Sequence, residues 1–237
     1  MFSQPAVRTD PIRYPVSTRI APPAQSRASD DLSETNPLTR AMQMMGTAMS
    51  FPRNTEIFGE NEPADYIYQV ISGSVRTYKI LNDGRRQVGG FYLPGDIFGL
   101  EFADEHTFSA EAIADTKAIL VKRSALTALA ARNATISREL LAITGGELRR
   151  VQDHVLLLVK SAQERVASFL LEMAERARAG NTVELPMSRQ DIADYLGLTI
   201  ETVSRTLTGL ESAAAIEVPT SRRIVLRNRA ALSQLNG

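Results

Sequence analysis

The sequence contains no cysteine in its 237 residues and only two histidines, His106 and His154. The lack of cysteine excludes disulfides, thiolate metal sites and iron–sulfur clusters held by cysteine. Two isolated histidines are also too few to supply several convergent metal ligands or a Ser/His/Asp constellation. We therefore expect no metal, no cofactor and no enzymatic activity.

The chain also lacks excess charge and long apolar runs. Lys plus Arg and Asp plus Glu number 27 each, so net charge gives no general reason to expect a nucleic acid or a membrane as partner. No segment reaches about 18 uninterrupted apolar residues, and charges and prolines interrupt the N-terminal region where a secretory signal needs an apolar core. We expect a cytoplasmic protein without a membrane partner, and any charge argument must be local.

What is present suits a folded chain of about two domains, because 43% of the residues are hydrophobic. Residues 1–36 differ, with five prolines among Ser, Thr, Gln and Arg and few clustered apolar residues. This segment is predicted to be a mobile tail. A short helix is predicted from Pro37 to the stop at Gly46.

Short β-type runs follow the short helix. Residues 66–71, 74–80, 86–93 and 117–123 are rich in β-branched and aromatic residues and are separated by turn residues. The dipeptide Asp83-Gly84 between two of these runs is a strong hairpin signal. The pattern predicts an antiparallel β domain. Its carboxylate pairs, such as Glu111 with Asp115, are expected to be solvated turn charges.

A long proline-free helical stretch comes next, and an apolar seven-residue repeat runs along it. One heptad position holds Leu141, Leu148, Val155 and Ala162, and the other holds Thr144, Val151 and Leu158. So narrow a stripe is typical of two parallel helices packed in a symmetric dimer. Packing of one helix on its own domain is the alternative. A second amphipathic helix is predicted over residues 163–180, with Gly180 as its stop.

Two short helices with a tight turn are predicted near the C-terminus. Ser188 and Asp191 form an S-x-x-D capping pattern that opens a helix from Arg189 to Leu196. Gly197 suits a positive φ at the turn, and Thr199 caps a helix that continues to about Glu211. This spacing is that of a helix-turn-helix.

The N-terminal half of the second helix is predicted to face bases in a major groove. Glu201 can accept from a cytosine amino group, Arg205 can donate to guanine, and Ser204 can serve either kind of partner. The alternative is an i,i+4 pair of Glu201 with Arg205 on a solvated surface. A hairpin wing follows, whose local basic patch can face phosphates; the patch comprises Arg222, Arg223, Arg227 and Arg229.

These features resemble the cyclic AMP receptor/fumarate-nitrate reductase regulator (CRP/FNR) superfamily of bacterial transcription factors. The likeness covers residues 38–237 and rests most specifically on the stretch LPMSRQDIADYLGLTIETVSRTL. It implies an α+β fold with a β-roll (a double-stranded, jelly-roll-like β-helix), a long dimerisation helix and a C-terminal winged helix-turn-helix. The expected domains are the tail (1–36), the β-roll (37–134), the dimerisation helix (135–162) and the DNA-binding domain (163–237).

The resemblance also implies roles for individual residues. Glu201, Ser204 and Arg205 match the E-x-x-S-R pattern of the fumarate-nitrate type, which implies base reading at a palindrome of TTGA-like and TCAA half-sites. The residues expected at the DNA backbone are Ser188, Arg189, Gln190, Thr199, Thr202 and Arg222. The implied protein is a homodimeric activator that contacts RNA polymerase, and its interface residues are Leu141, Thr144, Leu148, Val151, Val155 and Leu158.

The sensing end departs from both founding types of the family. Cyclic AMP binders carry a glutamate and an arginine where this chain has Leu100 and Phe108, and an unpaired buried phosphate would cost several kcal/mol. The cluster-holding cysteines of the other type are missing as well. This favours the FixK-type branch, regulators of microaerobic or nitrogen-fixation genes that need no effector. The alternatives are the same DNA reader gated by haem or another small effector, and a cupin-like metal enzyme. Asn61 replaces a family glycine at a turn, where asparagine tolerates positive φ.

Overall fold

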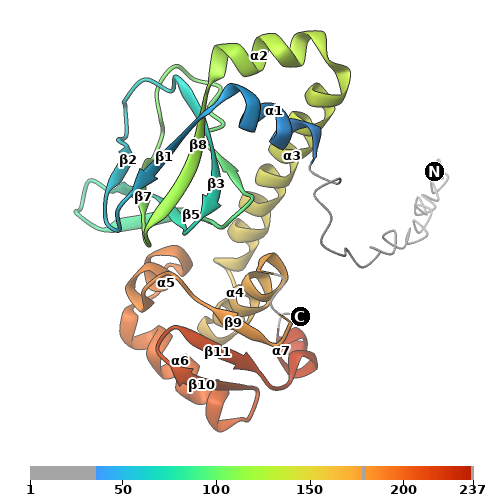
Figure 1. The fold of residues 1–237 in the computed structure, drawn as a ribbon. Coiled ribbons are helices and arrows are strands. Elements are labelled where there is room, and N and C mark those ends of the chain that lie inside the picture. The colour runs from blue at the N-terminus through green and yellow to red at the C-terminus, as the bar shows by residue number, and fades with distance from the viewer. Residues whose placement is uncertain (1–35, 178–179, 236–237) are drawn as a thin grey trace, which may run out of the picture. The chain divides into compact units, whose positions relative to one another are not determined.

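The computed structural model describes residues 36–177 and 180–235, and the fold is α+β (Figure 1). The predicted mobile tail lies outside the described residues except for Asn36. The described part comprises a β-roll, a long helix beside it and a C-terminal domain of helices with a small sheet. No helix in the described ranges has both the length and the apolar character needed to cross a membrane.

The β-roll consists of two four-stranded antiparallel sheets. One has the order β1-β8-β3-β6 and the other β2-β7-β4-β5. Buried side chains from both sheets, among them Val70, Phe98 and Ala110, fill the space between them. The bounds are β1 Thr47–Phe51, β2 Glu56–Phe58, β3 Tyr66–Ser72, β4 Val75–Ile80, β5 Arg86–Tyr92, β6 Ile97–Phe98, β7 Ser109–Ala112 and β8 Thr116–Lys122. The four predicted β runs are therefore strands β3, β4, β5 and β8.

The turn between β4 and β5 is the one predicted at Asp83-Gly84. Ile80 pairs with Arg86 across it, and the N–H of Leu81 donates to the carbonyl of Arg85 at 2.8 Å. Gly84 has φ +83°, a conformation that only glycine adopts at little cost. Asn61 also has a positive φ of 65°, as its tolerance predicts.

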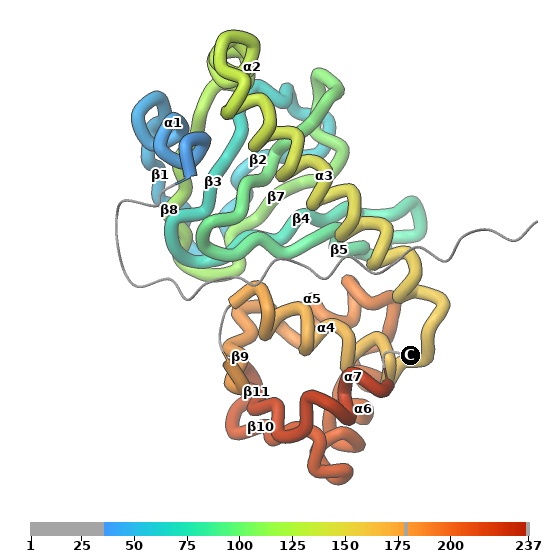
Figure 2. Tube along the Cα trace, turned by 90° about the vertical axis from the view of Figure 1, so that its right-hand side faces the viewer, coloured from blue at the N-terminus to red at the C-terminus, as the bar shows by residue number. Residues whose placement is uncertain are grey.

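Helices α1 (Pro37–Met45), α2 (Arg123–Arg132) and α3 (Ala134–Leu157) flank the β-roll. Figure 2 shows α3 running past the β-roll to the C-terminal domain. The helix ends at Leu157, so the prediction of one helix to residue 162 was wrong. Ser161 and Glu164 form a capping box that starts the next helix, and the fourth heptad residue, Ala162, belongs to that helix.

The C-terminal domain contains four helices within the described residues and a three-stranded sheet of order β10-β11-β9. Its elements are α4 Ala162–Arg176, β9 Thr182–Glu184, α5 Arg189–Leu196, α6 Ile200–Ser212, β10 Ile216–Thr220, β11 Arg223–Leu226 and α7 Arg229–Leu235. Helix α4 ends at Arg176 and not at Gly180. Ala177 is its C-cap, and the N–H of Ala177 donates to the carbonyl of Met173. Helix α7 was not predicted from the sequence.

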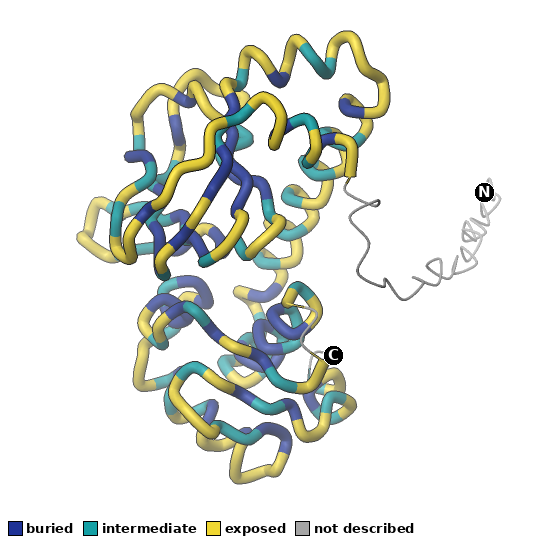
Figure 3. Tube along the Cα trace, viewed as in Figure 1, coloured by how far each residue is buried: buried dark blue, intermediate teal, exposed yellow. Residues whose placement is uncertain are grey.

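The core of the C-terminal domain continues into the β-roll. Phe91 on β5 packs against Phe169 of α4 and Tyr195 of α5, with ring centroids 6.1 and 5.3 Å apart. Val88 and Ile113 of the β-roll belong to the same buried cluster. Figure 3 shows buried segments in the β-roll strands and in the helices below them. The two domains therefore share an apolar contact, which bears on how the helix-turn-helix is oriented.

Candidate nucleic-acid interface

Helix α5 begins as predicted, with a complete capping box. The N–H of Asp191 donates to Oγ of Ser188 at 3.1 Å, and Oδ2 of Asp191 accepts from the N–H of Ser188 at 2.9 Å. Two free amide groups at the helix start are thereby satisfied, which fixes the first turn. Arg189 and Gln190, predicted to contact the DNA backbone, lie in that turn, where Gln190 is exposed and Arg189 is half-buried.

The turn between α5 and α6 is compact. Gly197 has φ +63°, and the N–H of Leu198 donates to the carbonyl of Ala193 at 3.0 Å. The guanidinium of Arg165 donates to the carbonyl of Leu196 at 2.9 Å, so α4 holds this turn in place. Thr199 then caps α6 by accepting from the N–H of Thr202. The helix-turn-helix predicted from the sequence is present with these bounds.

Helix α6 buries one face and exposes the other. Val203, Leu207 and Leu210 pack into the core, whereas Glu201 and Arg205 are exposed. Ser204 lies between them in sequence and is half-buried. The three predicted base-reading residues are therefore neighbours on the outer side of the N-terminal half of α6.

Glu201 is held as a carboxylate near the start of α6. Hydrogen bonds from its own backbone N–H and from Thr199 lower its pKa, and Arg205 acts in the same direction. Among the described residues no ion pair joins Glu201 to Arg205, and the partners of the Glu201 carboxylate are Thr199 and its own backbone N–H. This weakens the alternative of a closed surface pair and leaves an acceptor and a donor presented together.

Each of the four arginines of the predicted basic patch contacts another group of the protein. Arg227 pairs with Glu217, and Nε of Arg223 lies 3.6 Å from Glu184. Arg229 donates to the carbonyl of Gly180 at 3.1 Å. Arg222 donates to the carbonyl of Pro186 at 3.0 Å, which ties the wing to the entrance of α5. Arg223 and Arg227 are thus paired with carboxylates, whereas Arg222 and Arg229 keep their charge because their partners are neutral carbonyls.

Helix α3 exposes the predicted heptad residues. Leu141, Leu148, Val151 and Val155 are 72, 58, 56 and 57% exposed. Thr144 is half-buried, and Leu158 lies just past the helix end and is 37% exposed. A Cβ added at Gly145 or Gly146 would meet no atom within 4 Å, so these glycines are not required for packing within one chain. The apolar stripe is therefore not packed on its own domain.

A cavity between the β-roll and α3, called here the β-roll cavity, is small, and no Lys, Arg or His lines it. Its volume is about 190 Å³, and the charged residues in its lining are Glu101 and Glu147. Leu100 and Phe108, the residues expected in place of a glutamate and an arginine, line it as well. Ligand pockets are typically about 300 to 1,000 Å³. Nothing in this lining would pair with a phosphate.

His106 lies in the loop that precedes β7, and its side chain is packed inside the domain. It is buried and stacks on Phe58 with ring centroids 3.6 Å apart. Burial lowers its pKa, against the opposing effect of Glu101 at 3.8 Å. His154 stacks on Tyr195, and burial lowers its pKa too. Both histidines therefore serve as ring-packing residues within the described chain.

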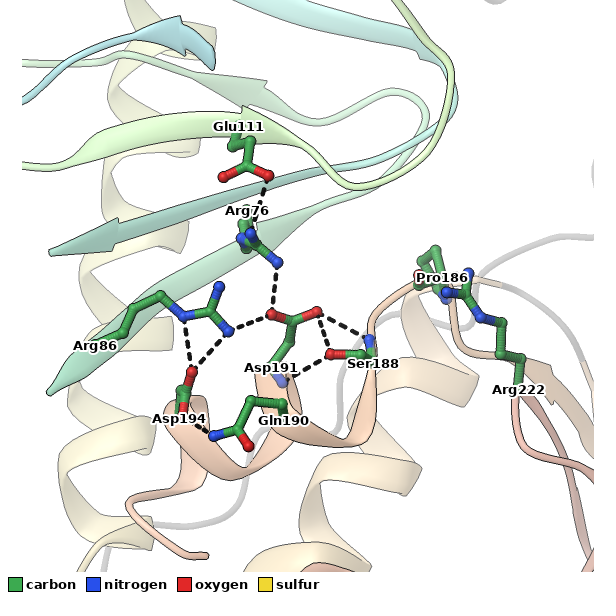
Figure 4. Close-up of polar contacts among 9 residues, drawn as sticks. All are labelled: Arg76, Arg86, Glu111, Pro186, Ser188, Gln190, Asp191, Asp194 and Arg222. Carbon is green, nitrogen blue, oxygen red and sulfur yellow. Dashed lines mark hydrogen bonds and ion pairs between the residues drawn. The ribbon is translucent and has the colours of Figure 1, made fainter. Parts of the chain in front are cut away.

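The polar residues that join the two domains were not predicted from the sequence. Arg76 and Arg86 of the β-roll contact Asp191 and Asp194 of α5, as Figure 4 shows. Glu111, predicted to be a solvated turn charge, is in fact mostly buried and pairs with Arg76 at 3.0 Å. The error arose because this carboxylate has its partner on a neighbouring strand, 35 residues away. The sequence offers no local signal for such a contact.

Comparison with known proteins places these features in a family. Residues 48–133 match the cyclic nucleotide-binding domain family, and residues 164–235 match the Crp-like helix-turn-helix domain family. The chain is 47% identical to the nitrogen fixation regulation protein FixK of Azorhizobium caulinodans over 93% of its length and 90% of the relative's. It is 41% identical to the FixK of Rhizobium meliloti, over 86% of this chain and 97% of that one.

A solved structure agrees with this assignment. The structure of FixK2 from Bradyrhizobium japonicum superposes with a TM-score of 0.79 at 52% identity, covering 81% of this chain and 98% of that chain. The β-roll, the long helix and the winged helix-turn-helix are thus the fold expected from the sequence. The chain belongs to the CRP/FNR family of DNA-binding transcription regulators, which are not enzymes, and is similar to its FixK members.

Proposed function

We propose that the protein is a homodimeric transcription activator that reads a palindromic TTGA-N6-TCAA-like site. The observation that carries the proposal is the exposure of an acceptor and a donor, Glu201 and Arg205, on the N-terminal half of α6. This is the helix that we propose enters the major groove. Ser204 is the third proposed base-reading residue. Each side chain has the chemistry needed at a base edge, and neither Glu201 nor Arg205 forms an ion pair within residues 36–177 and 180–235.

The proposed dimer forms through α3. Four of its exposed apolar residues, Leu141, Leu148, Val151 and Val155, lie at the two heptad positions, and a second copy of the same helix would bury them. Thr144 and Leu158 complete the proposed stripe. The segment assigned to dimerisation, residues 135–162, is helical to Leu157. The β-roll (37–134) and the DNA-binding domain (163–237) flank it in the proposed division.

Two-fold symmetry sets the geometry of the proposed site. Half-sites of four base pairs separated by six place their centres about 10 base pairs apart, which is one turn or about 34 Å of duplex. One recognition helix per subunit then enters each successive major groove. The residues proposed to contact the backbone and set the register are Ser188, Arg189, Gln190, Thr199, Thr202 and Arg222.

The proposed activity needs no nucleotide effector. The β-roll cavity of about 190 Å³ is lined by two glutamates and by no cation, so a cyclic nucleotide phosphate would lie among like charges. The names of the similar FixK proteins support a role in nitrogen-fixation gene control. Contact with RNA polymerase and a cytoplasmic location are part of the same proposal.

Binding to labelled duplexes at fixed salt tests the proposal. We expect the protein to bind the palindrome at least about 10³-fold more tightly than a scrambled duplex, with two chains per duplex by sedimentation. Added cyclic AMP should leave the dissociation constant unchanged, and the purified protein should show no haem absorption band. Equal affinity for both duplexes, or one chain per duplex, would refute the proposed function.

A further inference from the structure

A connected set of ion pairs holds α5 against strands β4 and β5 (Figure 4). Arg76, Arg86, Asp191 and Asp194 form it, and we call these four residues the interdomain latch. Nη1 of Arg76 lies 2.6 Å from Oδ1 of Asp191, and Nη2 of Arg86 lies 2.7 Å from the same oxygen. Arg86 also donates from Nε to Oδ2 of Asp194 at 2.7 Å. Two arginines of the β-roll thus form ion pairs with two aspartates on one helix.

The two oxygens of Asp191 have separate partners. Oδ2 accepts from the N–H and the hydroxyl of Ser188, at 2.9 and 2.7 Å, and so closes the capping box. Oδ1 accepts from the two arginines. The same carboxylate therefore starts α5 and ties that start to the β-roll. Any shift of α5 along the β-roll would separate Oδ1 from both cations.

Because the latch is buried, its ion pairs favour one orientation of α5 on the β-roll more than they add to stability. The side chains of Asp191 and Arg76 are 4 and 12% exposed. Buried ion pairs add little net stability over apolar contacts, but an arrangement that leaves one charge unpaired is strongly disfavoured. The adjacent contact of Phe91 with Tyr195 is apolar and contains no charge that has to be paired. The ion pairs are therefore the part of this interface that selects one orientation.

The orientation of α5 is passed on to the recognition helix. The turn at Gly197 is held by the bond from Leu198 to Ala193 and by Arg165. Asp194 also accepts from Gln190 at 2.6 Å, so the latch reaches a residue proposed to contact the DNA backbone. Because α5 and α6 pack as one unit, fixing α5 fixes the direction in which α6 points.

We propose that Arg76 and Arg86 are positioning residues that set the separation of the two recognition helices in the dimer. The inference rests on the proposed palindromic site, because only a site with two half-sites reports that separation. The latch consists of the protein's own side chains, so it holds the reading orientation without a bound ligand. Its signature is the choice of spacer length and not the affinity for one half-site.

The test compares duplexes with the N6 spacer and with spacers one base pair shorter or longer, plus a duplex with a single half-site. We expect the unmodified protein to prefer the N6 spacer by about tenfold or more. Arg86→Met keeps the apolar stem but removes the charge, and should reduce that preference to about threefold or less. Its affinity for the single half-site should stay within about twofold of the unmodified protein.

Arg85→Met is the matched control, since Arg85 neighbours Arg86 but is exposed and, in the part of the chain that the structure describes, forms an ion pair only with Asp83 in the turn. It should keep the full spacer preference. The charge exchange Arg86→Asp with Asp194→Arg should restore the preference that Arg86→Asp alone removes. A preserved preference in Arg86→Met, an equal loss on the single half-site, or no restoration by the exchange would overturn the latch. If the unmodified protein itself shows no preference for the N6 spacer, the proposed palindromic function is refuted, and so is the role of the latch that rests on it.

Discussion

The guanidinium of Arg222 in the wing donates a 3.0 Å hydrogen bond to the carbonyl of Pro186, two residues before the capping Ser188. The contact uses one nitrogen of a half-buried side chain and brings its positive charge to the entrance of α5. That is the end of the helix where the backbone amides favour an anion. The wing and α5 are thus joined at the place where a phosphate is expected.

Removal of this charge should therefore weaken DNA binding without changing sequence preference. Arg222→Ala is expected to lower affinity for specific and scrambled duplexes alike, and to reduce the slope of log affinity against log salt by about one. Arg227→Ala is the control in the same wing, because that charge is already paired with Glu217. An unchanged salt slope in Arg222→Ala would remove Arg222 from the DNA contact.

Arg205→Ala should instead reduce discrimination between sequences. A guanidinium that donates to guanine is worth about 1 to 3 kcal/mol of specific binding, or about 5- to 150-fold. Affinity for scrambled duplex should fall far less. The measurement is the ratio of the two dissociation constants at one salt concentration. If the ratio equals that of the unmodified protein, Arg205 does not read a base.

A charge in the apolar stripe of α3 should break the dimer. Leu148 is counted twice in a two-fold interface, so Leu148→Glu loses about 3 to 6 kcal/mol of burial, a weakening of about 10² to 10⁴ in the dimer dissociation constant. Ile80→Glu is the control, since Ile80 is also exposed but lies on β4. Sedimentation equilibrium distinguishes the two. A dimeric Leu148→Glu variant would place the interface elsewhere.

The same substitution at two glycines should change stability in opposite directions. Gly197→Ala forces a Cβ into a backbone with φ +63° and is expected to cost about 1 to 2 kcal/mol. Gly209 is an exposed helical residue whose added Cβ meets nothing within 4 Å. Gly209→Ala should gain about 0.5 to 1 kcal/mol. Denaturant unfolding followed by circular dichroism checks both, and a loss at Gly209 or a gain at Gly197 would contradict these backbone assignments.

Stability should fall as pH drops below the ordinary histidine pKa. Burial lowers the pKa values of His106 and His154 from 6.5 in the folded protein. The unfolded chain then binds more protons, so stability is lost from about pH 6.5 downward until the folded pKa values are reached. Burial raises the pKa values of Glu147 and Glu172, which act in the opposite direction.

The double variant His106→Gln/His154→Gln isolates the effect of the histidines, because it keeps the same glutamates as the unmodified protein. Its unfolding free energy should depend less steeply on pH between about 7.5 and 5.5 than that of the unmodified protein. Denaturant titrations at several pH values give the slopes. Parallel pH profiles would show that the histidines do not titrate differently in the folded and unfolded chain.

Local patterns carried most of the prediction from sequence. The Ser188 cap, Gly197 and the Asp83-Gly84 hairpin each depend on residues a few positions apart, and each was predicted at its observed place. The end of α3 was missed although a signal existed, since Ser161 and Glu164 form an S-x-x-E capping box. The heptad repeat continues in the sequence to Ala162, across the end of the helix.

Contacts between distant segments were not predictable in the same way. Arg76 and Asp191 are 115 residues apart, and nothing near either residue indicates the other. The pairing of Arg222 with Pro186 and the burial of His106 on Phe58 are of the same kind. Such contacts follow from how whole elements pack, so a single sequence shows the residues without their partners.

Selection of bound duplexes from a random pool, at stated salt, tests the central claim most directly. The claim is that two recognition helices present Glu201, Ser204 and Arg205 to successive major grooves. Selection should enrich a two-fold symmetric motif with TTGA-like and TCAA-like half-sites whose centres are about 10 base pairs apart. Recovery of no motif, or of a single unpaired half-site, would contradict the account.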